Sequence, residues 1–242
     1  MNLILRDMVI KNEFNIMYVL KKIEEATSLG ITRLVIAPAY FDEESKSSIS
    51  EVKNIVDDLN KYLYENKIDL KLYSASLLRD NFDNIKDFLE GKLGTINESE
   101  YILLKVEESN SLNELLEIIY ELTLREYVPI IVAPEKIPQI RDNYKNINKL
   151  LAEKCLFQLD INSFNGADGK KVLKTAKILK KKDIYSFVGY EEVTKKENII
   201  KDRDGINKNI ENISKKSLYI LNKSSELNKI TKSKKEKEKQ LS

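Results

Sequence analysis

Seven charged side chains are the best candidates for chemistry in this chain, because each lies at or just after the end of a short apolar run. They are five acids and two lysines: Asp7, Lys105, Glu107, Glu135, Lys136, Asp160 and Glu192. If the acids converge, their oxygens would form the kind of site that holds Mg²⁺ or Ca²⁺. The alternative, which we favour, is that they pair with Lys105 and Lys136 and hold no ion.

Histidine and paired cysteines, the usual groups for metal binding and acid–base chemistry, are missing. None of the 242 residues is histidine, and Cys155 is the single cysteine. A chain with one cysteine cannot form an internal disulfide or a dithiol site. Cys155 stands between Lys154 and the apolar Leu156, so we expect it to be a small core residue and not a nucleophile.

The elements that must position these residues are short apolar runs alternating with segments of helical period. This pattern is typical of βα units around a parallel sheet. Both a βα barrel and a doubly wound sheet place ligand sites at the carboxyl ends of their strands. Seven runs are predicted as strands, at residues 2–5, 33–37, 70–74, 101–106, 129–133, 155–159 and 184–188.

Other signals set the limits of the domain and its class. Ser48 with Glu51, and Ser111 with Glu114, have the spacing of a capping box and predict two helix starts. Residues 1–230 are predicted to form one domain, and the Lys/Glu-rich residues 231–242 a disordered tail. A net charge of +2 argues against nucleic-acid binding, and the lack of a long apolar run or signal peptide argues for a cytoplasmic protein without membrane insertion.

The order of three stretches resembles a known family. They are residues 29–38, residues 128–135, and residues 155–158 running on to Gly166 and Gly169. These stretches are similar to the CpsB-like protein-tyrosine phosphatases of capsule synthesis, within the polymerase and histidinol phosphatase (PHP) superfamily. The likeness covers about the first four fifths of the chain. It implies a distorted seven-stranded α/β barrel of PHP type; a doubly wound sheet is the alternative architecture.

The resemblance also implies where that family's metal ligands fall. Its histidines fall on Leu5, Asp7, Ala39, Ala133 and Glu192, and its bridging glutamate falls near Ser76. Its phosphate-gripping arginine falls on Lys136, which keeps the charge without the planar fork. The family uses manganese or other divalent metals, whereas these replacements predict no cofactor here.

Three functions remain open from the sequence. The first is an inactive phosphatase homologue that acts by binding, in control of capsule or exopolysaccharide synthesis, with a bacterial tyrosine kinase or a polysaccharide-assembly protein as its partner. The second is an active tyrosine phosphatase or phosphoesterase with a rebuilt carboxylate site. The third is a structural subunit that forms homo-oligomers through its outer helices.

Overall fold

The structure, a computed structural model, describes residues 2–5, 9–10, 13–14, 16–28, 31–38 and 47–190. The predictions made for Asp7, Ala39, Glu192 and the tail at residues 231–242 lie outside the described residues.

Eight parallel strands form one sheet, in the order β5-β4-β1-β10-β9-β8-β7-β6. Their bounds are β1 Asn2–Leu5, β4 Arg33–Ile36, β5 Lys71–Ser74, β6 Leu77–Arg79, β7 Tyr101–Lys105, β8 Val128–Val132, β9 Leu156–Asp160 and β10 Tyr185–Tyr190. A short antiparallel pair, β2 (Val9–Ile10) and β3 (Glu13–Phe14), stands apart from it. The α/β class with parallel strands, predicted from the sequence, is confirmed. Each of the seven predicted runs overlaps a strand of the sheet, whereas β6 and the short pair β2 and β3 were not predicted.

The two outer strands of this sheet, β5 and β6, are consecutive in the chain. Only Ala75 and Ser76 separate them. The Ala75 N–H donates to the Ile36 carbonyl (2.9 Å), and the Leu77 N–H donates to the Pro38 carbonyl (3.2 Å). Leu77 then pairs in register with Leu103 of β7. Within a few residues the chain therefore passes from one edge of the sheet to the other.

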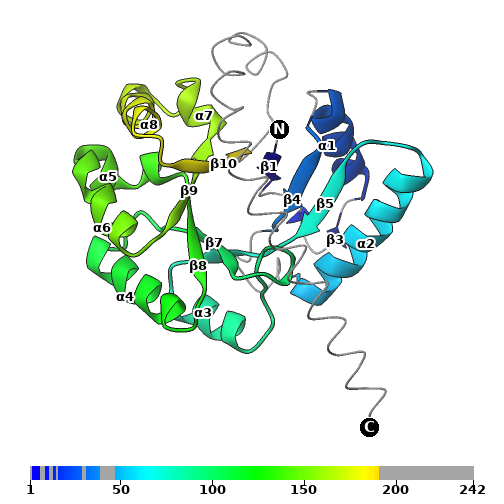
Figure 1. The fold of residues 1–242 in the computed structure, drawn as a ribbon, viewed down its shortest axis with the longest axis horizontal. Helices are drawn as coiled ribbons and strands as arrows, with labels where there is room; N and C mark the ends of the chain where they lie inside the picture. Colours follow the sequence, from blue (N-terminus) through cyan, green and yellow to red (C-terminus); the bar gives the residue numbers. More distant parts are fainter. Residues whose placement is uncertain are drawn as a thin grey trace.

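Helices surround the strands, as Figure 1 shows. The α-helices are α1 Ile16–Ser28, α2 Ile49–Glu65, α3 Phe82–Leu89, α4 Leu112–Thr123, α5 Pro138–Asp142, α6 Ile147–Ala152, α7 Ile161–Phe164 and α8 Lys170–Lys181; three 3₁₀ turns are η1 Ile96–Glu98, η2 Pro134–Lys136 and η3 Tyr144–Asn146. Both predicted capping boxes are confirmed, at the starts of α2 and α4. Within the described residues, no helix is both long and apolar enough to cross a membrane.

Alternating side chains of the strands build two apolar layers. Leu34 and Ile36 of β4 belong to the large cluster that also contains the buried faces of the helices. Val35, between them, belongs to a smaller cluster on the other face of the sheet, together with Leu103 and Phe187. Covering both faces with apolar side chains is what a parallel sheet requires.

Four helices end in a left-handed residue that is not glycine. Lys67 follows α2 (φ 55°), Glu126 follows α4 (φ 64°), Lys154 follows α6 (φ 59°) and Asp183 follows α8 (φ 55°). Glycine is the usual residue at this position because a Cβ atom is strained there. Because these four positions carry residues with a Cβ atom, the four helix ends are strained.

We predict that Lys67→Gly raises the free energy of unfolding by about 1 kcal/mol, because it removes the strain of a left-handed residue that carries a Cβ. Lys61→Gly, also at an exposed lysine but inside α2, should lower it by about 1 kcal/mol. Urea unfolding of both variants measures the two changes. A loss of stability in Lys67→Gly would contradict this account of the helix end.

Candidate functional site

Polar side chains gather where β8 and β9 end, in a group that we call the Lys136 cluster: Glu135, Lys136, Asp160, Asp168 and Tyr185. Lys136 and Glu135 come from η2, directly after β8, and Asp160 ends β9. Asp168 lies in the loop between α7 and α8, which Gly166 and Gly169 flank with positive φ angles. The turn into η2 begins at Ala133, which is left-handed (φ 50°).

Lys136 is held by two carboxylates. Its Nζ lies 2.7 Å from Oδ2 of Asp160 and 3.0 Å from Oδ2 of Asp168. Asp160 is fully buried, and its Oδ1 accepts a hydrogen bond from the Asn162 N–H at the start of α7 (3.0 Å). The Ser163 hydroxyl donates to Asp168 Oδ2 (2.9 Å). The Lys136 amine is thus fixed between two anions, and its positive charge compensates the buried carboxylate of Asp160.

Glu135 makes contacts that differ from those of Lys136, the next residue in the sequence. Its Oε1 accepts from the Asp160 N–H (2.9 Å) and its Oε2 accepts from the Tyr185 hydroxyl (3.0 Å). Complete burial raises the pKa of Glu135 to about 7, although the Asp160 N–H opposes the shift. Burial, followed by the charge of Glu135, also raises the pKa of Tyr185 well above its ordinary value. Glu135 was expected to neutralise Lys136. In the structure, Lys136 pairs with Asp160 and Asp168 instead.

A second group, the Asp80 cluster, lies where β6 and β7 end: Arg79, Asp80, Glu107 and Asn110. Arg79 Nε lies 3.0 Å from Glu107 Oε1, so Glu107 pairs with Arg79, where the sequence suggested Lys105. Asp80 Oδ1 accepts from the Glu107 N–H (2.7 Å), and the Asn110 amide donates to the Asp80 carbonyl (2.8 Å).

The carboxyl group of Asp80 is buried and only partly satisfied. Asp80 is 1% exposed, and its Oδ2 has no hydrogen-bond partner among the described residues. Burial raises the pKa of Asp80 to about 6, against the lowering effect of the Glu107 N–H. Lys105 lies beside this cluster, since it pairs in register with Arg79 and its carbonyl accepts from the Asp80 N–H (3.1 Å).

The structure therefore splits the predicted site residues into two groups. Glu135, Lys136 and Asp160 come together, while Glu107 lies with Arg79 and Asp80. Sequence reasoning missed Asp80, because β6 was not predicted, and it missed Asp168 and Tyr185. The two glycines around Asp168 were the only local signal for its loop.

The described residues do not fit the metal centre that the resemblance implies. Among them, no group of three or more acids or cysteines could hold a metal ion. Glu107 pairs with Arg79, Asp160 pairs with Lys136, and Glu135 accepts from the Asp160 N–H, so each of these three acids contacts a protein group. The side chain of Ala133 packs in the smaller apolar cluster, and the Ser76 hydroxyl accepts from the Gly94 N–H (3.0 Å).

Gly189 of β10, three residues before Glu192, is also committed to packing. A Cβ atom added there would overlap Gln158 of the neighbouring strand, whose side-chain amide lies against the glycine. Gln158 is fully buried, and its amide has no hydrogen-bond partner among the described residues. This position is therefore filled by a side-chain amide packed on the glycine backbone.

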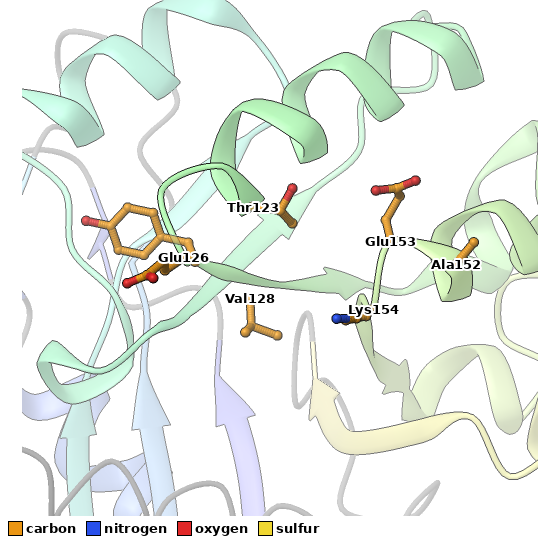
Figure 2. Close-up of a pocket in the computed structure, with 7 residues that line it drawn as sticks. Thr123, Glu126, Val128, Ala152, Glu153 and Lys154 are labelled. Carbon is orange, nitrogen blue, oxygen red and sulfur yellow. The ribbon is translucent and has the colours of Figure 1, made fainter.

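Figure 2 shows a pocket of about 350 Å³ at the other end of the strands. It lies between the ends of α4 and α6 and the start of β8, and its walls include Thr123, Glu126, Val128, Ala152, Glu153 and Lys154. Ligands of parallel α/β domains bind at the carboxyl ends of strands. This pocket is therefore separate from the candidate site.

Cys155 is a buried thiol, as predicted. It is 3% exposed, and burial raises its pKa to about 12.

We predict that Cys155 reacts with a maleimide at pH 8 at least tenfold more slowly in the native protein than in urea, because only the thiolate attacks. Equal rates in the two conditions, followed by mass spectrometry, would contradict the buried placement.

We predict that the stability of the protein falls between pH 5 and pH 8 because of Glu135. Its folded pKa lies above its ordinary value, so its contribution is fully present below about pH 4.5 and is lost as the pH rises through 7. Glu135→Gln stays neutral and keeps the geometry, so this variant should lose on the order of 3 kcal/mol less than the natural protein across that range. Urea unfolding at both pH values measures the difference.

The matched control for this prediction is Glu117→Gln, which changes an exposed carboxylate on α4. It should leave the pH dependence as it is in the natural protein. If Glu135→Gln and Glu117→Gln behave alike, the buried carboxyl is not the source of the effect.

Comparison with known proteins gives several matches. The chain is 24% identical to the tyrosine-protein phosphatase YwqE of Bacillus subtilis (strain 168) over 163 residues, which are 67% of this chain and 64% of YwqE. It is 26% identical to the putative tyrosine-protein phosphatase CapC of Staphylococcus aureus over 152 residues, which are 63% of this chain and 60% of CapC. The matches thus span less than two thirds of the length of each relative.

Solved structures and a family model agree with these matches. The fold is similar to that in the crystal structures of YwqE from Bacillus subtilis and CpsB from Streptococcus pneumoniae, described as unique metal-dependent tyrosine phosphatases, with a TM-score of 0.62, 23% identity and 72% of each chain covered. The model of the family "Capsular polysaccharide synthesis, CpsB/CapC" matches residues 13–228. Since this match takes in most of its length, the chain belongs to the CpsB/CapC family.

Proposed function

We propose that this chain is a catalytically inactive homologue of the metal-dependent tyrosine phosphatases, and that it acts by binding in the control of capsule or exopolysaccharide synthesis. The observation that carries the proposal is the absence of histidine from the whole sequence. Metal-dependent hydrolysis of a phosphate ester needs ions that polarise the phosphoryl group and supply hydroxide near neutral pH. Alanine at position 133 offers no lone pair for such an ion.

The state of Lys136 supports the same proposal. By resemblance, this lysine replaces an arginine that grips phosphate. Here its Nζ is paired with Asp160 and Asp168, at 2.7 and 3.0 Å. A phosphate would have to compete with both carboxylates, and the side chain lacks the planar fork of arginine. The end of β8 therefore offers neither histidine ligands for a metal nor a lysine that is available to bind phosphate.

For the fold, the proposal includes a closed seven-stranded barrel in which β5 and β6 are one bent strand. Their two-residue separation and the hydrogen bonds from Ala75 and Leu77 to the end of β4 support closure. The smaller apolar cluster would then fill the interior of the barrel. The Lys136 and Asp80 clusters would lie around its mouth.

Partners and setting follow from the family and are part of the proposal. The family is described by capsular polysaccharide synthesis, which makes a bacterial tyrosine kinase or a polysaccharide-assembly protein a fitting partner in the cytoplasm. Self-association through the outer helices is compatible with this role. Mass measurement in solution, with and without a candidate partner, would separate the two kinds of assembly.

An active phosphoesterase is the second candidate, and Asp80 favours it. A carboxyl group with a pKa of about 6 and a free buried oxygen has the properties of a general acid or base. It lies at the end of β6, where a barrel of this kind would carry catalytic groups. This candidate requires metal ligands from the parts of the chain outside the described residues.

The experiment that tests the proposal is an assay of purified protein with p-nitrophenyl phosphate and with a phosphotyrosine peptide, with and without manganese. We predict no turnover above a heat-killed sample, while YwqE assayed in parallel serves as the positive control. Metal-dependent turnover that falls at least tenfold in Asp80→Asn would overturn the proposal and establish the active alternative. Metal analysis of the same preparation gives a second, independent readout.

A further inference from the structure

A second pocket lies at the amino ends of β4 and β5, away from both polar clusters. Its volume is about 310 Å³, and its walls include Thr32, Arg33, Asn60, Tyr64, Lys71 and Tyr73. It opens between these strand starts and the end of α2. The volume is at the lower end of the range for small-molecule sites, which is about 300–1,000 Å³.

Two cations stand side by side in this pocket. Arg33 begins β4 and Lys71 begins β5, and the two residues pair in register, so their side chains leave the same face of the sheet. Neighbouring strands are about 4.8 Å apart. Like charges in such positions repel each other and destabilise the pairing. Within the described part of the chain, neither side chain makes an ion pair or a hydrogen bond.

One nitrogen of the Arg33 guanidinium is buried. Its Nε is buried and has no acceptor among the described residues. A charged donor that is buried without a partner is costly, and an anion would remove that cost. Guanidinium groups present two parallel donors that match the oxygens of phosphate and carboxylate groups.

Two further residues shape the pocket. Tyr73 is 6% exposed, and its hydroxyl makes no hydrogen bond among the residues that the structure describes, so it is a free donor. The Asn60 amide, by contrast, is used: it donates to the Leu72 carbonyl (3.0 Å) and accepts from the Leu72 N–H (2.9 Å). This pair of bonds fixes α2 against β5 and holds the wall in place.

We propose that this pocket binds a small oxyanion, either a phosphate or a carboxylate group of a small molecule, between Arg33 and Lys71. Asp69 also lines the pocket, but it is exposed and one acid stands against two cations. The site is independent of the proposed function, because it lies at the opposite ends of the strands from the Lys136 cluster. Arg33, Lys71 and Tyr73 would recognise a phosphate and a carboxylate group in the same way.

Calorimetric titration with inorganic phosphate, and separately with succinate, tests the site at constant low ionic strength. We expect saturable binding of at least one probe. The double change Arg33→Met and Lys71→Met should weaken it at least tenfold, while Lys177→Met on α8 should leave it unchanged. Lys177 is the matched control because it is also an exposed lysine, outside the pocket. The probe that binds more tightly identifies the preferred anion.

Lys71→Met alone guards against misfolding of the double variant, because its side chain is exposed. It should weaken binding at least threefold and leave the far-ultraviolet circular dichroism spectrum unchanged. Failure of the natural protein to bind either probe would overturn the proposal. Binding that persists in Lys71→Met and in the double variant would do the same.

Discussion

The two-residue link between β5 and β6 is the constraint on which the rest of the structure depends. Two residues join the opposite edges of the sheet, so the edges are held near each other by covalent bonds. Exposed strand edges invite pairing with other chains. Here backbone hydrogen bonds from Ala75 and Leu77 to the end of β4 use groups that an open edge would leave unpaired. The same link places the end of β6, with Arg79 and Asp80, next to β7.

The charged groups at the ends of β8 and β9 pair with other groups of the protein. Asp160 and Glu135 are both fully buried, and each is compensated by a group from another element: a lysine, backbone N–H groups or a tyrosine hydroxyl. A buried carboxylate without such partners would be strongly destabilising. These contacts connect η2, β9 and β10, and they leave the cation of Lys136 already paired. The face of the sheet that carries Leu103, Ala133 and Phe187 is packed with apolar side chains, and the buried amide of Gln158 lies against Gly189.

Much of the fold could be predicted from the sequence, because strand and helix signals are local. Apolar runs located seven strands, and capping boxes located the starts of α2 and α4. β6 was missed because Leu77 and Leu78 follow the small residues Ser74, Ala75 and Ser76 too closely to read as a new run. The pairing of side chains at the site was harder, since the partner of Glu135 is 50 residues away and that of Glu107 comes from the unpredicted strand. Such pairs depend on the strand order of the sheet, which local patterns do not encode.

The hydrogen bond from Tyr185 to Glu135 also bears on how the protein folds. During synthesis, Glu135 leaves the ribosome 50 residues before the tyrosine that satisfies it. Until β10 arrives, the carboxyl group must stay in water or protonate, and the region around η2 cannot reach its final packing. A fragment that stops before β10 would keep this region loose. The last part of the sheet is therefore expected to form as one late, cooperative unit.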